Sequence, residues 1–284
     1  MNSLLVKIYD TIPKRLRLKL GQSKWLKGLR RQLLYDSEGF KTAQVLVERI
    51  YENYKVNFQF VASIKMASKA KNNGIENTVL RNSFRLIQKY KPNRTDLAVL
   101  DVGSNFGYLG GVWADSIAKN GKVLAFEPNK NLYKSISRTI EANVNFKTNF
   151  KIYNLAVGAK NEMITLNVSS FSSNAQSMKT AVETYDVEMV TLDDFLNKKN
   201  IQEIDVIKID VDGIELDILN GAENLLKQNN SIVIVETNDD IRIVELFQEL
   251  DYNIYDMKLN VFDNSEALPL NIFCVPKKIE KDAV

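Results

Sequence analysis

The chain has no histidine among its 284 residues and only one cysteine, Cys274. The absence of histidine excludes a Ser-His-Asp triad, proton transfer by an imidazole and every zinc site that needs a histidine ligand. A single cysteine excludes an intrachain disulfide and a cysteine-based metal site, and it fits a reducing cytosol. Any general base must therefore be a carboxylate, a lysine or a tyrosine.

The sequence also lacks a long apolar run and a strong charge imbalance. No run approaches the ~18 residues that would span a bilayer. The N-terminus has no apolar core followed by a small-residue cleavage site, so no signal peptide is expected. The net charge is +3 and apolar residues make up 45 % of the chain. We therefore expect a cytoplasmic protein with a proper core and no general nucleic-acid role.

One stretch reads as strand, glycine turn, helix and strand. An apolar run ends in Asp101, and a turn with Gly103 and Gly107 follows it. After a helical stretch, a second apolar run ends in Glu127, twenty residues beyond Gly107. This order is typical of half of a nucleotide-binding α/β sheet. The glycines would let a ligand approach the backbone, and the acid would bind ribose hydroxyls.

Two cofactors fit this outline, NAD and S-adenosylmethionine. A dinucleotide fingerprint has a middle glycine where the pyrophosphate approaches, and here Asn105 occupies that position. The Asp101 carboxylate would repel a pyrophosphate, whereas it would attract a sulfonium or an ammonium group. The turn therefore favours S-adenosylmethionine, and an NAD-dependent oxidoreductase stays as the alternative.

Strands and helices alternate along the rest of this region. The expected strands are 150–154, 163–168, 206–210, 232–236, 253–257 and 271–276, and the expected helices are 108–121, 131–143, 212–221 and 241–250. The serine-rich stretch 169–185 is long for a connection, so we expect a substrate loop there. The pattern predicts a mostly parallel sheet with helices on both faces and ligands beyond the carboxyl ends of its strands.

Four acids end apolar strands in this pattern, namely Asp101, Glu127, Asp210 and Glu236. Because the carboxyl ends of parallel strands share one edge, these acids should converge on one crevice, close to Glu215. Clustered carboxylates repel one another unless a cation or hydrogen-bond donors offset the repulsion. Asp210 is the first candidate for a general base or metal ligand, with Glu215 and Glu236 as supports. Asp212 and Glu215 also have the spacing of a helix-capping box.

Residues 1–95 are expected to form a mostly helical, basic extension. One helix is expected around Val45–Tyr54 and another over 77–90, whereas 56–64 is ambiguous between strand and helix. Residues 1–34 carry nine Lys or Arg against a single acid, Asp10, with leucines at helix-like spacing. Such a segment would pack on the catalytic domain, contact the acceptor or rest peripherally on the inner face of an anionic membrane.

The region resembles the FkbM-type family of S-adenosylmethionine-dependent methyltransferases. The resemblance covers roughly residues 99–236. It rests on LDVGSNFG at 100–107, AFEP at 125–128, LAVG at 155–158, VTLDDF at 190–195, IDVIKIDVDGIELDIL at 204–219, NGA at 220–222 and IVIVE at 232–236. Ser104 replaces a usual alanine, and Asp212 replaces a commoner glutamate. Both departures are mild.

The resemblance implies a Rossmann-like class I methyltransferase core with a seven-stranded sheet at 96–284, after an N-terminal extension at 1–95. It implies methyl transfer from S-adenosylmethionine to an oxygen, so we expect a sugar hydroxyl of a glycan, a glycolipid or another small hydroxylated acceptor. The candidate cofactor-binding residues are Asp101, Gly103, Ser104, Asn105, Gly107, Glu127, Pro128, Ala156 and Asp210. By position, the glycine turn would line the methionine part of the cofactor and Glu127 its ribose.

Three other readings remain open at this point. A divalent metal such as magnesium would suit the acids, although no metal ligand is assigned. A membrane-peripheral binding protein with a degenerate core would also explain the basic N-terminus. A nucleic-acid methyltransferase is disfavoured, because IDVDG stands after the fourth strand where an Asn-Pro-Pro-Tyr type motif would be expected.

Overall fold

The computed structural model describes residues 3–13, 15–16, 28, 34, 40–168, 173–174, 183–228, 230–263, 265 and 267–281. Its centre is a seven-stranded sheet in the order β12-β13-β11-β10-β3-β4-β5. The strands are β3 (Ala98–Val102), β4 (Lys122–Phe126), β5 (Phe150–Tyr153), β10 (Val206–Ile209), β11 (Ile232–Glu236), β12 (Tyr252–Tyr255) and β13 (Asn271–Pro276). Only β13 runs antiparallel to its neighbours, β11 and β12. The predicted mostly parallel sheet is confirmed.

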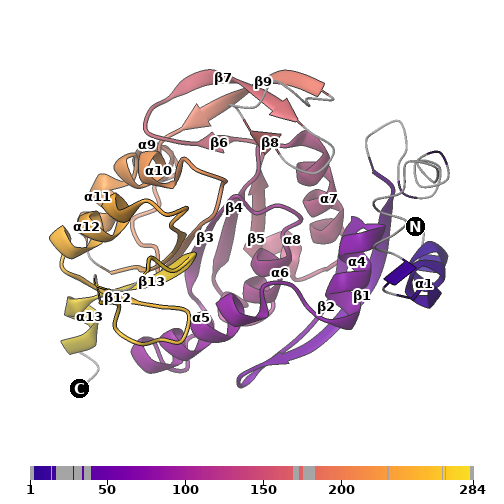
Figure 1. Cartoon of the computed structure of the whole chain (residues 1–284), viewed down its shortest axis with the longest axis horizontal. Helices are drawn as coiled ribbons and strands as arrows, with labels where there is room; N and C mark the ends of the chain where they lie inside the picture. Colours follow the sequence, from indigo (N-terminus) through magenta and orange to yellow (C-terminus); the bar gives the residue numbers. More distant parts are fainter. Residues whose placement is uncertain are drawn as a thin grey trace.

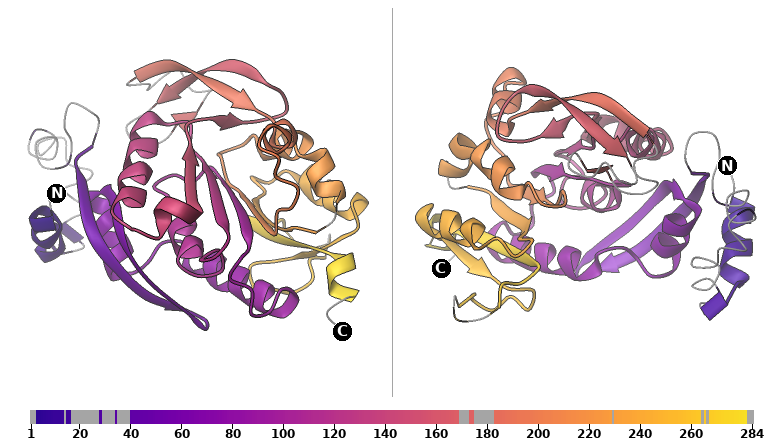
Figure 2. Two further views of the ribbon diagram at one scale, coloured as in Figure 1. Left: turned by 180° about the vertical axis from the view of Figure 1, so that it is seen from behind. Right: turned by 45° about the horizontal axis from the view of Figure 1, so that its top comes forward.

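Helices cover both faces of this sheet (Figures 1 and 2). One face carries α5 (Asn77–Tyr90), α6 (Tyr108–Ala114), α7 (Lys130–Glu141) and α8 (Phe146–Asn149). The other carries α9 (Leu192–Lys198), α10 (Glu215–Asn220), α11 (Glu223–Lys227) and α12 (Ile241–Glu249), and α13 (Lys277–Lys281) follows the last strand. Side chains alternate along each strand, so Val99 packs in the first core and Leu100 in the second.

The helix expected over 108–121 is shorter than predicted. It ends at Ala114, well before Gly121. The side-chain amide of Asn149 donates hydrogen bonds to the carbonyl oxygens of Ala114 and Ala118 at 2.8 and 2.9 Å. These carbonyls are therefore satisfied without further helical turns, and an irregular segment leads into β4.

The helix expected around Val45–Tyr54 is wrong. The segment forms β1 (Thr42–Tyr51), which pairs with β2 (Tyr54–Ser63) in a hairpin whose turn residue Glu52 has φ +51°. Ala43, Val45 and Val47 are buried, whereas Leu46 and Ile50 are exposed. The apolar residues that mimic helical spacing therefore lie on both faces of a strand. The ambiguous stretch 56–64 is also strand, and the helix over 77–90 is confirmed as α5.

Side chains from α7 and from the residues just beyond it form hydrogen bonds with the backbone of β2 along the edge that β1 leaves unpaired. The Asn143 side chain, just beyond this helix, accepts from Gln59 N at 2.8 Å and donates to Gln59 O at 2.7 Å. The Thr139 hydroxyl accepts from Val61 N at 2.9 Å, and the Ser135 hydroxyl donates to Val61 O at 2.8 Å. These contacts satisfy the edge as a third strand would, and they fix the hairpin against the main domain.

Two further helices complete the described N-terminal segment. Helix α4 (Ile64–Asn72) follows the hairpin, and α1 (Ser3–Thr11) packs on α4, where the Ser68 hydroxyl contacts the Asp10 carboxylate. One apolar core continues from Val6 through Phe84 to Val99. The expectation of a mostly helical extension thus missed the hairpin, and the boundary at residue 95 stays a prediction.

A small second sheet covers the carboxyl edge of the main sheet (Figure 1). It contains β6 (Ala156–Val157), β7 (Glu162–Val168), β8 (Ser173–Asn174) and β9 (Glu183–Val190) in the order β6-β9-β7-β8. The Tyr185 hydroxyl donates to Pro128 O at 3.1 Å and accepts from Lys130 N at 2.8 Å. The proposed substrate loop at 169–185 lies largely outside the described residues. No helix in the described part of the chain is long and apolar enough to cross a membrane.

Replacing Asn143 by Leu tests the docking of the hairpin. The change leaves Gln59 N and O without their partners, so we expect the free energy of unfolding to fall by about 1–3 kcal/mol. Chemical denaturation measures it. Val144→Ala, at a neighbouring side chain that is 81 % exposed, should change stability by less than about 0.5 kcal/mol. Equal stability of Asn143→Leu and the wild type would contradict this account of the edge.

Candidate functional site

The glycine turn after β3 is built from three left-handed residues. Gly103, Asn105 and Gly107 have φ of +73°, +53° and +72°. A Cβ atom on Gly103 would lie 1.9 Å from the carbonyl oxygen of Asp210, and one on Gly107 would lie 3.0 Å from the Ile136 side chain. Gly103 is therefore required mainly because two loops of the protein touch. The expected sharp turn is confirmed by the positive φ angles, and close approach by a ligand stays a prediction.

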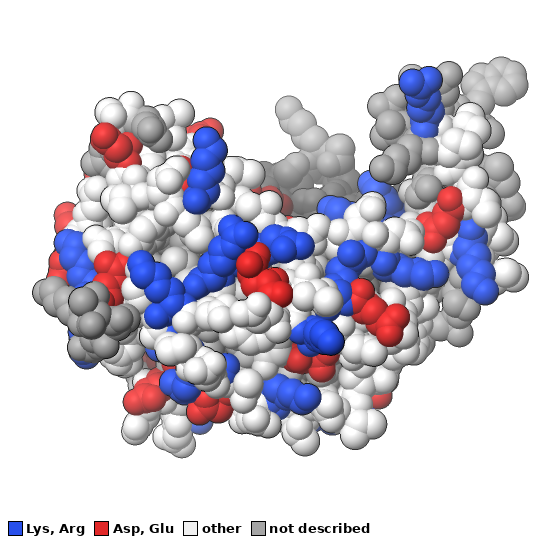
Figure 3. All heavy atoms as spheres, turned by 90° about the horizontal axis from the view of Figure 1, so that it is seen from below, with Lys and Arg blue, Asp and Glu red and all other residues white. Residues whose placement is uncertain are grey.

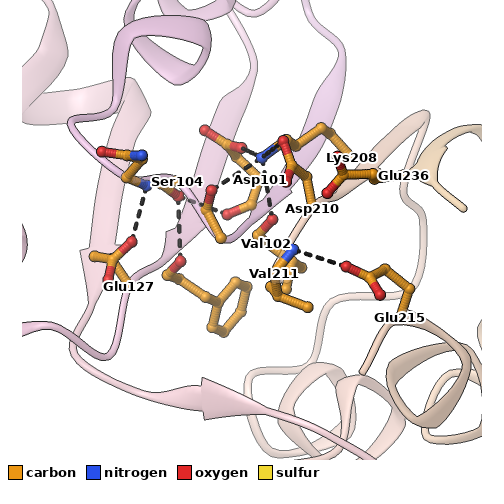
Figure 4. Close-up of polar contacts among 12 residues, drawn as sticks. Asp101, Val102, Ser104, Glu127, Lys208, Asp210, Val211, Glu215 and Glu236 are labelled. Carbon is orange, nitrogen blue, oxygen red and sulfur yellow. Dashed lines mark hydrogen bonds and ion pairs between the residues drawn. The ribbon is translucent and has the colours of Figure 1, made fainter. Parts of the chain in front are cut away.

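Asp101 ends β3 with a buried and unsatisfied carboxylate. The residue is 1 % exposed, and neither carboxylate oxygen has a hydrogen-bond partner among the described residues. Its nearest cation is the Lys208 ammonium, 3.8 Å from Oδ1 (Figure 4). Burial raises the pKa of Asp101, and the charge of Lys208 opposes that shift. Buried polar groups are normally hydrogen-bonded, so an unsatisfied buried carboxylate indicates that a ligand supplies the missing donors.

Lys208 is a buried cation in the middle of β10 that the sequence analysis missed. Its Nζ donates to Gly103 O at 2.9 Å and to Val102 O at 3.4 Å, and it lies 3.5 Å from Oδ2 of Asp210. Burial alone would lower the pKa of Lys208, but the charges of Asp210, Asp101 and Glu76 outweigh it, so the pKa is raised and the side chain stays charged. A polar residue inside the apolar run VIKID was the available signal.

Glu127 ends β4 and is almost completely buried. Its carboxylate accepts backbone N–H groups from Asn105 at 2.8 Å and from Asn129 at 2.9 Å. Burial raises the pKa of Glu127 to about 7, and these two hydrogen bonds oppose the shift. The carboxylate therefore holds the glycine turn and the start of α7 together while its remaining lone pairs stay available.

Ser104 has a structural task in the same turn. Its hydroxyl donates to Asp101 O at 2.7 Å and lies 3.3 Å from Phe126 O, so it ties the ends of β3 and β4. This tie explains how serine can replace the usual alanine at this position without loss. The hydroxyl proton is used within the protein, and the backbone N–H of Ser104 also donates to Phe126 O at 3.1 Å, so Ser104 has mainly a structural role in the turn.

Asp210 and Glu236 form a carboxyl pair at the ends of β10 and β11. The Asp210 side chain is 33 % exposed, which leaves it accessible from the crevice. Desolvation, followed by the charge of Asp210 and a hydrogen bond between the two groups, raises the pKa of Glu236 to about 7. At neutral pH Glu236 is therefore protonated in about half of the molecules.

The Glu215 carboxylate reaches toward the backbone of Val211 and not into the cavities of the site (Figure 4). Its carboxylate accepts backbone N–H groups from Val211 at 3.1 Å and from Gly213 at 3.0 and 3.1 Å. It therefore fixes the loop after β10. The expected capping box with Asp212 is not formed, because Glu215 instead reaches back to the residues on either side of Asp212.

Two adjoining cavities gather most of the predicted residues. A cavity of about 180 Å³ is lined by Asp101, Gly103, Ser104, Asn105, Glu127, Pro128 and Asp210, together with Lys208 and Glu76. A smaller cavity of about 70 Å³ is lined by Ala156 and by apolar side chains such as Phe126, Leu155 and Val157. Both share Gly103 and Pro128. Gly107, Glu215 and Glu236 line neither cavity.

This arrangement fits S-adenosylmethionine. The unpartnered Asp101 carboxylate would accept from the ammonium group, the free lone pairs of Glu127 would accept from ribose hydroxyls, and the apolar cavity beside Ala156 would hold the adenine ring. Among the described residues no group of three or more His, Cys, Asp or Glu side chains is arranged to hold a metal ion. The magnesium expectation stays untested.

The pKa of Glu127 predicts a pH-dependent stability. The folded state holds a proton up to about pH 7, whereas the ordinary value is 4.5. Between these values the folded state binds more protons than the unfolded chain, so stability falls as pH rises from about 5 to 8. Glu127→Gln should remove roughly 2 kcal/mol of that fall. Denaturation at both pH values measures it, with Glu249→Gln as an exposed control. Parallel pH profiles of wild type and Glu127→Gln would refute the assignment.

Comparisons with solved structures find methyltransferases of low sequence identity, with TM-scores below 0.5. A methyltransferase FkbM from Methylobacillus flagellatus has 13 % identity and a TM-score of 0.45, covering 64 % of this chain but only 44 % of that one. An S-adenosylmethionine-dependent O-methyltransferase from Thermotoga maritima has 12 % identity, a TM-score of 0.40 and coverages of 82 % and 77 %. At these values the likenesses carry no argument about chemistry. No curated protein matches the sequence.

The sequence itself matches a family model. The model describes a methyltransferase FkbM domain, and the match runs over residues 101–257. These bounds include the glycine turn, Glu127, Lys208 and the carboxyl pair, and they leave the N-terminal hairpin outside. The resemblance inferred from the motifs is confirmed. Since the match spans more than half of the chain, the protein belongs to the FkbM family of S-adenosylmethionine-dependent methyltransferases.

Proposed function

We propose that the protein methylates a hydroxyl oxygen, most simply that of a sugar in a glycan, a glycolipid or another small hydroxylated molecule. The observation that carries this proposal is the position of Asp210. Its carboxylate lines the larger cavity, is accessible, and adjoins a second carboxyl group whose pKa is about 7. A hydroxyl is a weak acid, so its methylation needs a proton acceptor of this kind.

In the proposed reaction the donor supplies the methyl group and the protein removes the proton of the acceptor hydroxyl. When bound, S-adenosylmethionine supplies a methyl group on a positively charged sulfur. Asp210 would accept the acceptor's hydroxyl proton as the new bond to carbon forms. Glu236 would share that proton when it is ionised, which its pKa of about 7 allows in about half of the molecules at neutral pH. Lys208 would keep Asp210 oriented from 3.5 Å away.

The charge of the cavity supports a neutral acceptor. Its walls carry the carboxyl groups of Glu76, Asp101, Glu127, Asp210 and Asp212 against the single ammonium of Lys208. A phosphate or carboxylate next to the reacting hydroxyl would be repelled. A sugar ring with free hydroxyls meets no such penalty and can donate hydrogen bonds to these acids. The same argument disfavours the diphosphate of NAD.

Asp210→Asn tests the proposed base. Methyl transfer should fall by ~10²-fold or more, because the amide cannot accept the proton. Glycans isolated from a strain lacking the gene would serve as acceptor, and mass spectrometry would follow the gain of the methyl group. Glu249→Gln, on the exposed side of α12, is the control. A loss of only a few-fold would remove Asp210 from this role.

We further propose that the N-terminal segment rests on an anionic membrane surface. Leu4, Ile8 and Leu16 are 67 %, 48 % and 51 % exposed, and Lys7 and Arg15 are exposed among them. Residues 1–95 carry 20 Lys or Arg against 6 Asp or Glu, a net charge of +14, so the rest of the chain carries −11 of the total of +3. Exposed aliphatic groups beside basic ones suit a lipid surface. Figure 3 shows many basic side chains, interspersed with acidic ones, on the face seen from below.

Vesicle sedimentation tests this contact. The wild type should bind vesicles of phosphatidylglycerol and phosphatidylcholine, and the double variant Leu4→Ser, Ile8→Ser should bind them several-fold more weakly. Leu270→Ser, at another exposed side chain (61 %), should bind as the wild type does. Equal binding of all three proteins to the vesicles would contradict the proposal. So would a wild type that binds RNA but not vesicles, with the double variant binding RNA equally well.

A further inference from the structure

Glu76 is a cavity residue that lies outside the part of the chain matched by the family model. It immediately precedes α5, where it lines the larger cavity together with Asp101, Lys208 and Asp210. Its side chain is exposed, so it lies at the mouth of the cavity rather than in its floor. The family match begins only at residue 101. The N-terminal segment therefore supplies a charged group to the site.

The turn that carries Glu76 is held by a buried hydrogen-bonded chain of side chains. The hydroxyl groups of Tyr51 in β1 and Tyr108 in α6 lie 2.8 Å apart, and Tyr51 also donates to Oδ1 of Asn77 at 3.1 Å. A Cβ on Gly74 would lie 2.8 Å from the Tyr51 hydroxyl. The glycine turn and the turn at 74–77 are thus joined through the hairpin, which places Glu76 in advance of any ligand.

The Glu76 carboxylate has no task within the protein. Although Glu76 is the N-cap residue of α5, its side chain makes no capping hydrogen bond, and only its backbone oxygen accepts, from Leu80 N at 3.0 Å. No ion pair or side-chain hydrogen bond of Glu76 occurs among the described residues. Its left-handed backbone (φ +49°, ψ +43°) is unusual for a residue other than glycine or asparagine.

The carboxylate of Asp101 is the second half of the site. It is buried, it has no hydrogen-bond partner among the described residues, and it lines the same cavity. Lys208 forms no hydrogen bond with it, because the ammonium lies 3.8 Å from Oδ1 of Asp101. Glu76, Asp101, Lys208 and Asp210 line this one cavity. Partial burial raises the pKa of Glu76, the charge of Lys208 opposes that shift, and the charges of Asp210 and Asp101 add to it.

We propose that Glu76 and Asp101 together bind the amino group of the donor's methionine part. The inference rests on the proposed use of S-adenosylmethionine and adds a residue that the family match does not contain. A primary ammonium has three N–H donors, so it can bond a buried carboxylate and one at the cavity mouth at the same time. An acceptor hydroxyl would satisfy only one of them.

Two ligands that differ only in the amino-acid part test the proposal. S-adenosylhomocysteine carries the amino group, and 5′-methylthioadenosine keeps the adenosine and the sulfur without it. Calorimetric titration of Glu76→Gln should show about tenfold weaker binding of S-adenosylhomocysteine than the wild type, because a charged hydrogen bond is lost. Binding of 5′-methylthioadenosine should change by less than about twofold. Glu249→Gln should bind both ligands as the wild type does.

The outcomes separate this inference from the proposed function. If the wild type binds neither ligand, the proposed use of the cofactor fails. If the wild type binds both and Glu76→Gln binds S-adenosylhomocysteine equally well, only the role of Glu76 is refuted. Equal weakening of both ligands by Glu76→Gln would also refute it, because that result reports a distorted cavity. Thermal unfolding of each variant confirms that it is folded.

Discussion

The site depends on one buried ammonium group. Lys208 lies in the centre of β10, beneath the glycine turn, and its hydrogen bonds to Gly103 and Val102 hold the turn against the neighbouring strand. Its charge also offsets the repulsion between Asp101 and Asp210. Without it, several acids would meet in a cavity of about 180 Å³ with no internal cation. Lys208 therefore reduces the repulsion between the acids, and their remaining negative charge can attract a positively charged ligand that enters the cavity.

The N-terminal hairpin makes the second contribution. Helix α7 satisfies the edge of β2, and the tyrosine pair Tyr51–Tyr108 joins β1 to the first residue of α6. These contacts make residues outside the family match part of the cavity wall.

Much of the fold could be predicted from residues. The apolar strands ending in Asp101, Glu127, Asp210 and Glu236 are where the pattern placed them, because parallel strands buried on both faces leave a clear signal. The hairpin could not be recognised, since the exposed apolar residues Leu46 and Ile50 imitated a helical face. Whether such a segment is a strand or a helix depends on the direction of its side chains, which the sequence alone does not show.

The site shows the same division between position and role. The acids do converge, but strand ends alone could not reveal that Glu215 turns back to its own loop or that Ser104 is occupied by carbonyl groups. Glu76 and Lys208 were missed for different reasons. Glu76 does not follow a strand of the main sheet, and it comes close to the cavity only because the hairpin holds the turn at 74–77 there. Lys208 stands in a motif quoted as a family signature, yet its chemistry appears only when its partners are known.

The central claim is that the excess of negative charge in this cavity selects a positively charged methyl donor. Calorimetric titration of the wild type and of Asp101→Asn with S-adenosylmethionine tests it most directly. The account predicts that the wild type binds and that Asp101→Asn, shown to be folded by circular dichroism, binds at least about tenfold more weakly. Unchanged affinity in Asp101→Asn, or a wild type that binds NAD in place of S-adenosylmethionine, would contradict it.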